Sequence, residues 1–281
     1  DHDHGVVKAS MATLILSHES YFTHDTGAHH PECPDRLRSV LKALDQPALS
    51  GLVREDAPET TAVEVARAHP GGYLDNIVGA IPPHGLRHID GDTVVSPGSR
   101  EAMLRAAGAA VRAVDAVAGG EVENAFCAVR PPGHHAESRR PMGFCLINNA
   151  AVAALHARAA HGHRRVAVID FDVHHGNGTQ DIFWDDVEAF YASSHQYPFY
   201  PGTGSSRERG AHNNVVNVPL AAGDRGDVFR GGMRDEILPA LDAFKPDFVI
   251  ISAGFDAHKD DPLGQLGLTE IDFAWATAAI M

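Results

Sequence analysis

The stretch that decides the fold reads Val166-Ala-Val-Ile-Asp-Phe-Asp-Val-His-His-Gly-Asn-Gly-Thr179. Its β-branched start, residues 166–169, predicts a buried strand, and the glycines that follow predict a loop at the strand's carboxyl end. Ligands of open α/β sheets bind at that edge. Asp172 and His174 are two residues apart, so both side chains leave an extended segment on the same side. A carboxylate and an imidazole placed in this way predict a metal site compatible with zinc, the alternative being a polar strand end with solvated side chains.

Two further strand ends carry polar side chains that suit the same site. Pro131-Pro-Gly-His-His135 follows a short apolar run, and its rigid turn holds two imidazoles that suit general acid/base chemistry. Asp256 lies shortly after the apolar run 248–252, and at this position it could serve either as a third metal ligand or as a helix N-cap. A surface loop with incidental histidines is the alternative for the first segment. Because parallel strands end at one edge of a sheet, we expect the three segments to meet.

The rest of the chain alternates strands with helices. Ala-rich segments at 99–117 and 148–160 have apolar residues at helical spacing, and short apolar runs lie between them. This alternation predicts an α/β fold with a mostly parallel sheet flanked by helices. A length of 281 residues with 44% hydrophobic content fits a single domain over residues 11–281. Residues 1–10 are expected to be a tag or a disordered tail.

Composition narrows the class of partner. With 23 Lys and Arg against 37 Asp and Glu, the formal net charge is −14, which disfavours nucleic acid and suits a cationic substrate. No apolar run approaches the roughly 20 residues that span a bilayer, so no membrane association is expected. Three cysteines at scattered spacing fit a reducing compartment, and we expect a cytoplasmic location.

Taken together, the motifs resemble the zinc-dependent histone deacetylase family, including the bacterial histone-deacetylase-like amidohydrolases and the acetylpolyamine deacetylases. The resemblance runs from about residue 13 to the end of the chain. Asn177 and the Thr-Gln pair that follows are more similar to class II members than to class I. This class similarity implies a bacterial host. The matching segments, in family order, are residues 27–37, 130–136, 142–149, 170–180, 200–204 and 252–256.

The resemblance implies roles for individual residues. Asp172, His174 and Asp256 match the ligands of one zinc ion per chain. His134 and His135 match the tandem histidines beside the reactive water. The resemblance also implies that Asp170 orients His134, and that Asn177 stands where class I members carry a second aspartate. Further matches are the tunnel walls Gly143, Phe144 and Tyr200, the rim residue Leu263, and Arg36 near an inner acetate-release pocket. The resemblance also implies a structural potassium ion held by Asp170, the hydroxyl of Ser193 and the carbonyls of Asp172, His174 and Ser194.

One family feature is missing from the sequence. The usual oxyanion donor is a tyrosine in a Gly-Gly-Tyr turn after the last metal ligand. Only residues 257–281 follow Asp256, and all five tyrosines precede it. We therefore expect a catalytic domain that is C-terminally incomplete and lacks its last strands.

Three functions follow from these expectations. The first is a zinc-dependent amidohydrolase that removes acetyl or other acyl groups from lysine side chains or polyamines, with a homo-oligomer as one possible assembly. The second is a zinc-binding pseudoenzyme or scaffold with weak turnover, because the oxyanion-stabilising tyrosine is absent. The third is a di-manganese ureohydrolase of the arginase type, which would need further aspartates in both metal loops. Gly176-Asn-Gly178 and the Ala-His-Lys that follows Asp256 argue against the third.

Overall fold

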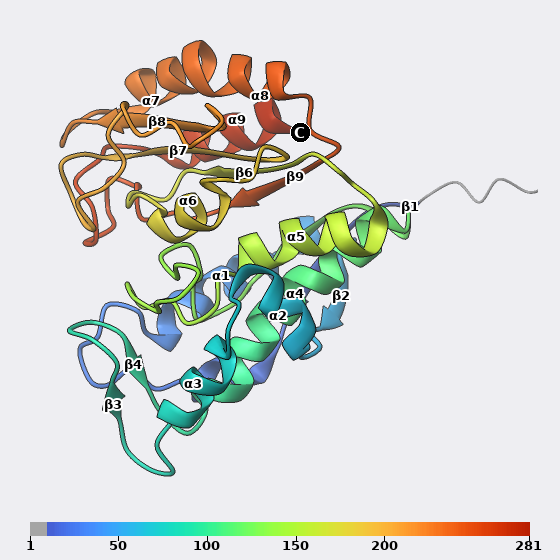
Figure 1. Ribbon diagram of the computed structural model, residues 1–281, viewed down its shortest axis with the longest axis vertical. Helices are drawn as coiled ribbons and strands as arrows, with labels where there is room; N and C mark the ends of the chain where they lie inside the picture. The colour runs from blue at the N-terminus through green and yellow to red at the C-terminus, as the bar shows by residue number, and fades with distance from the viewer. Residues whose placement is uncertain (1–9) are drawn as a thin grey trace, which may run out of the picture.

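The structure is a computed structural model that describes residues 10–281. Of the predicted tail at residues 1–10, residues 1–9 lie outside the described residues and Ser10 begins strand β1. Within this range the predicted α/β fold is confirmed (Figure 1). Seven parallel strands form two sheets, of order β2-β1-β5 and β8-β7-β6-β9, and a short antiparallel hairpin, β3-β4, stands apart. The strands are β1 (Ser10–Ser17), β2 (Val53–Asp56), β3 (Arg87–His88), β4 (Val94–Val95), β5 (Val122–Cys127), β6 (Val166–Asp170), β7 (Ala189–Gln196), β8 (Val215–Leu220) and β9 (Phe248–Ser252).

Helices cover both faces of the four-stranded sheet. In Figure 1 the orange helices α7 and α8 lie above it, and α5 lies below it. None of the helices in residues 10–281 is long and apolar enough to cross a membrane. The α-helices are α1 (Pro34–Leu44), α2 (Ala62–Ala68), α3 (Tyr73–Ala80), α4 (Ser99–Ala118), α5 (Asn149–His161), α6 (Asn177–Phe183), α7 (Gly226–Gly232), α8 (Leu238–Phe244) and α9 (Glu270–Ile280), with a π-helical turn at Met233–Ile237 between α7 and α8.

Strand β6 is buried along its whole length because side chains on each of its faces enter a different core. Val166 and Val168 pack in the cluster beneath α4 and α5, whereas Ala167 and Ile169 pack in the cluster beneath α7, α8 and α9. A strand covered on both faces needs apolar residues at consecutive positions, which explains the unbroken β-branched run. This central strand fixes the position of the loop that follows it.

The register of the four-stranded sheet brings the chemically important loops to one edge. Asp170, the last residue of β6, lies opposite Ser193 on β7 and Ser252 on β9. The loops that begin at residues 171 and 253 therefore start side by side. Strand β5 belongs to the other sheet, yet the loop after it reaches β6, because His134 contacts Asp170. The three segments predicted to meet at one edge are thus brought together.

Candidate active site

Asp172, His174 and Asp256 converge at this edge. His174 Nδ1 lies 3.1 Å from Asp172 Oδ1 and 3.1 Å from Asp256 Oδ2, and all three candidate ligand atoms lie within 4.8 Å of one another. Asp172 and His174 come from the loop after β6, and Asp256 comes from the loop after β9. Two carboxylates and one imidazole with an open fourth position are a donor set that suits catalytic zinc.

The electrostatics of this triad favour a bound cation. Burial and the charge of Asp172 raise the pKa of Asp256 to about 6. For Asp172, burial opposes ionisation, but His134 and His174 outweigh it and hold its pKa below the usual range. Burial likewise disfavours a charged His174, yet Asp172 and Asp256 raise its pKa to about 10. Since two carboxylates are forced together around one imidazole, a divalent ion would relieve their repulsion, and the residues fit zinc.

Backbone contacts hold the triad in place. Asp256 Oδ1 accepts a hydrogen bond from the backbone N–H of Val173 (2.9 Å), which ties the two loops together. Asp172 Oδ1 accepts from the backbone N–H of His174 (2.8 Å). Gly254 permits the close approach, because a Cβ atom at this position would lie 1.9 Å from Asp172 Oδ2. A side chain at residue 254 is therefore incompatible with the observed position of Asp172.

His134 is held by a buried carboxylate. Its Nδ1 donates to Asp170 Oδ2 (2.9 Å), and its Nε2 lies 3.7 Å from Asp172 Oδ1. Burial opposes a charge on the imidazole, but Asp170 and Asp172 together raise the pKa of His134 to about 9. This imidazole is therefore a proton donor at neutral pH.

His135 has the opposite character. Its Nδ1 lies 2.8 Å from Asn177 Oδ1, and the amide group of Asn177 is oriented by donation from Nδ2 to Glu137 Oε1 (2.8 Å). The amide oxygen thus faces His135, which places the imidazole proton on Nδ1 and leaves a lone pair on Nε2. Burial and the neighbouring charge of His134 lower the pKa of His135 well below its usual value. The pair combines a cationic and a neutral imidazole, a division typical of acid and base partners.

Aromatic residues flank the two imidazoles. Gly143 and Phe144 both have positive φ (58° and 69°), and a Cβ on Gly143 would lie 2.5 Å from His135 Cδ2. The ring of Tyr200 meets that of His135 edge-on at 5.1 Å between centroids. Phe199 stacks on His174 at 5.3 Å and 11° between planes. The predicted wall residues Gly143 and Tyr200 are therefore placed directly against His135.

A hollow of about 510 Å³ opens beside Phe144. Its lining includes His29 and His30, and the ring of His30 contacts that of Phe144 at 4.9 Å between centroids. Asp92 also contributes to this lining, where burial and the neighbouring carboxyl of Asp90 raise its pKa. A carboxylate and an aromatic ring in the same lining suit a cationic ligand.

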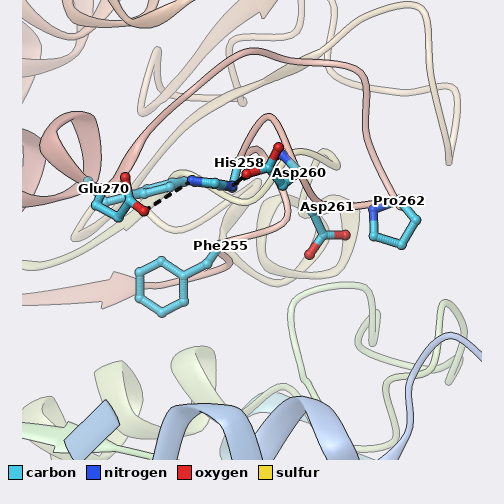
Figure 2. Close-up of a pocket in the computed structure, with 7 residues that line it drawn as sticks. Phe255, His258, Asp260, Asp261, Pro262 and Glu270 are labelled. Atoms are coloured by element: carbon cyan, nitrogen blue, oxygen red, sulfur yellow. Dashed lines mark hydrogen bonds and ion pairs between the residues drawn. The ribbon is translucent and has the colours of Figure 1, made fainter. Parts of the chain in front are cut away.

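A second hollow, of about 500 Å³, lies beside the loop after β9 (Figure 2). It is lined by Phe255, His258, Asp260, Asp261, Pro262, Glu270 and Phe273. The predicted rim residue Leu263 follows Pro262 and is half-buried. Arg36 Nη2 donates to Asp261 Oδ2 (2.7 Å), and burial, which opposes the charge, is outweighed by Asp261, so that the pKa of Arg36 is raised. Arg36 is thus held on the side of this loop, and its charge also acts on Asp256 and Asp172.

The predicted potassium ligands lie on β6, on β7 and in the loop after β6. Asp170 is completely buried, and Ser193 is its partner in the sheet register. The hydroxyl of Ser193 contacts His195 Nδ1 (2.8 Å), and the hydroxyl of Ser194 is buried without a hydrogen-bond partner among the described residues. The buried carboxylate of Asp170 and the neighbouring hydroxyl of Ser193 are oxygen donors compatible with a hard cation, and the potassium site stays a prediction.

Three site residues escaped the sequence analysis. Tyr191 donates from its hydroxyl to Asp170 Oδ2 (3.1 Å) and accepts from the backbone N–H of Gly176 (3.0 Å). Glu137 orients Asn177, and Phe199 stacks on His174. The sequence did signal Tyr191, because a phenol within a buried strand needs a polar partner.

Comparisons with known proteins point to one family. Residues 30–281 match the family model of the histone deacetylase domain. The chain is 42% identical over 260 residues to histone deacetylase 15 of Arabidopsis thaliana, covering 88% of this chain and 46% of that protein. It is 38% identical over 261 residues to a histone deacetylase-like amidohydrolase of Pseudomonas aeruginosa, covering 90% of this chain and 68% of that protein. The crystal structure of an acetylpolyamine aminohydrolase from Burkholderia pseudomallei superimposes with a TM-score of 0.85 at 30% identity, covering 96% of this chain and 90% of that one.

Proposed function

The chain belongs to the histone deacetylase family, and from this premise we propose that it is a zinc-dependent amidohydrolase that removes acyl groups from lysine side chains or polyamines. The observation that carries the proposal is the convergence of Asp172, His174 and Asp256 beside one cationic and one neutral imidazole. Zinc held by these three residues would polarise the acyl carbonyl and acidify the attacking water.

The two histidines would divide the proton transfers. His135 would accept a proton from the attacking water at Nε2, because Asn177 occupies its Nδ1 while burial and the neighbouring charge of His134 keep the ring neutral. His134, held cationic by Asp170, would donate to the departing amine. General acid/base catalysis of this kind contributes about 10² to 10⁴ in rate.

The substrate class follows from charge. An acidic chain with Asp92 in the rim hollow favours an acyl-lysine peptide or an acylated polyamine, both of which carry amine or backbone donors close to the acyl group. The aromatic rings of Phe144 and Tyr200 would contact the methylene chain. We propose one structural potassium ion near Asp170, Ser193 and Ser194, and a cytoplasmic location. Nucleic acid and membranes are not proposed as partners.

A zinc-binding pseudoenzyme is the second candidate, and the hydroxyls of three of the five tyrosines favour it. Those of Tyr21, Tyr73 and Tyr191 donate to Arg105 O, Leu146 O and Asp170 Oδ2. None of these three is free to donate to a tetrahedral oxyanion, and losing one such donor costs about 10² to 10³ in rate. This candidate predicts zinc binding with slow turnover.

Hydrolysis assays on two substrates test the proposal. We would measure amine release from an acetyl-lysine peptide and from an acetylated diamine, comparing the wild type with His135→Ala. The expected result is a fall of about 10² to 10⁴ in kcat/KM with zinc content unchanged. His212→Ala is the matched control, because His212 is exposed and pairs only with Asp185 on the surface. Wild-type zinc binding without measurable hydrolysis of either substrate would favour the pseudoenzyme, and undiminished activity in His135→Ala would overturn the assigned base.

A further inference from the structure

A second cluster of metal-ligating side chains lies away from the candidate active site. Asp115 in the last turns of α4 faces His156 and His161 on α5. Asp115 Oδ1 lies 2.7 Å from the Nε2 atom of each histidine, and the three candidate ligand atoms lie within 4.8 Å of one another. We propose that these three residues form a surface site for a zinc-class divalent cation.

The donor geometry suits replacement of two protons by one metal ion. Both imidazoles direct Nε2 at the same carboxylate oxygen, so without metal each ring donates its Nε2 proton to Asp115. In tetrahedral zinc sites with bonds of about 2.0 to 2.2 Å, ligand atoms lie about 3.3 Å apart. Each of the two distances from Asp115 Oδ1 to a histidine Nε2 therefore needs to lengthen by about 0.6 Å to admit the ion.

The surroundings favour a cation and leave a path for it. The carboxyl end of α5 lies at His161, and Asp115 is three residues from the end of α4, so the negative ends of both helix dipoles contribute. The side chain of His156 is 7% exposed and anchors the site from within, whereas those of Asp115 and His161 are 40% and 25% exposed. Solvent can therefore supply the remaining ligand.

Arg67 on α2 opposes metal binding in a defined way. Its Nη1 lies 2.9 Å from His156 Nδ1 and can act only as a donor. When Nε2 of His156 binds a metal ion, Nδ1 carries the proton and needs an acceptor instead. Arg67 is half-exposed and must turn away for the metal to bind. Arg67 thus weakens the site, and its replacement by an acceptor should strengthen it.

This cluster is separate from the candidate active site. Helix α5 begins beside the tandem histidines, where Asn148 Nδ2 donates to Ala136 O (3.1 Å), and it ends at His161. Helix α5 (Figure 1) has thirteen residues and spans about 20 Å, and His156 and His161 lie in its second half, away from Asn148. Its occupancy can therefore be changed without touching the residues assigned to hydrolysis.

Calorimetric titration of Zn²⁺ into the chelator-stripped full chain tests the proposal. The wild type should bind one more equivalent than His161→Ala, and the difference between the two is the quantity to read, because His2 and His4 could also bind zinc. Arg67→Gln, whose amide oxygen can accept from His156 Nδ1, should bind at this site about tenfold more tightly than the wild type.

His163→Ala is the matched control. His163 lies near His161, at 6.5 Å between ring centroids, but its ring packs against Phe248 and it is not part of the cluster. This variant should keep the wild-type stoichiometry, and all three variants should keep the wild-type hydrolytic rate. Equal stoichiometry and affinity in wild type and His161→Ala, or weaker binding in Arg67→Gln than in wild type, would overturn the proposal.

Discussion

Replacing Gly254 with alanine should remove zinc from the candidate active site without unfolding the protein. The new Cβ atom would lie 1.9 Å from Asp172 Oδ2 and 2.5 Å from Asp172 Cγ. To reach even a 3.0 Å contact, the carboxylate must retreat by about 1.1 Å, the difference between 3.0 and 1.9 Å. After this movement, the carboxylate of Asp172 can no longer reach a metal ion held by His174 and Asp256.

The size of the effect follows from the tolerance of metal coordination. Ligand distances in working sites stay within about 0.2 Å of their ideal values, so a displacement near 1 Å removes Asp172 from the ligand set. Loss of an outer partner of a ligand already costs 10- to 100-fold in metal affinity. We therefore expect Gly254→Ala to bind zinc at least about 100-fold more weakly, with hydrolysis falling by a similar factor at limiting zinc.

Zinc titration of the chelator-stripped variant, with circular dichroism to confirm folding, measures this effect. Gly231→Ala is the control because Gly231 lies in α7 with open space around it, where alanine should be neutral or stabilising by about 0.5 to 1 kcal/mol. If Gly254→Ala held zinc as tightly as Gly231→Ala, Asp172 would not be a ligand and the geometric reasoning would fail.

Two further predictions concern stability. Glu32→Gln should lower the free energy of unfolding, measured in urea, by about 3 kcal/mol, because it leaves the 2% exposed Arg130 without its charged partner. Asp35→Asn, the control in an exposed ion pair, should lower it by less than about 0.5 kcal/mol. Equal losses in the two variants would contradict this prediction. Burial lowers the pKa of both His24 and His69 to about 4, below the unfolded value near 6.5, so stability is complete above pH 6.5 and is lost as the pH falls from 6.5 to 4. Protonation of each histidine on unfolding should lower the free energy of unfolding by about 2 kcal/mol between pH 7.5 and 5. In His69→Gln the free energy of unfolding should therefore depend less steeply on pH than in the wild type. An unchanged slope would refute the assignment.

The elements predicted best from the sequence are those in which one local pattern settles the structure. The β-branched run predicts β6, which spans Val166–Asp170, and the Ala-rich segment 99–117 predicts α4, which spans Ser99–Ala118. Strand β2 was not predicted because its sequence, Val-Arg-Glu-Asp, is mostly charged and has no fully buried residue, so it lacks the apolar pattern of a strand. Helix α2 was missed although Thr61 and Glu64 form a capping box, a signal that can be read from sequence.

The division of the strands into two sheets could not be predicted, because strand pairing is decided by contacts distant in sequence. The site was predictable to the extent that its residues directly follow apolar strands, as Asp172 and Asp256 do. The residues that orient them were not, since Glu137 reaches Asn177 across 40 positions and Tyr191 reaches Asp170 across 21. Such partners depend on the final packing of side chains.

The central claim is that one zinc ion held by Asp172, His174 and Asp256 drives amide hydrolysis. The most direct test is to strip the protein with a chelator and follow deacetylation of an acetyl-lysine peptide as zinc is returned, in the wild type and in His174→Ala. The account predicts no activity without metal, recovery that saturates when the triad is filled, and no recovery in the variant. Hydrolysis that survives chelation, or that zinc restores equally in His174→Ala, would contradict it.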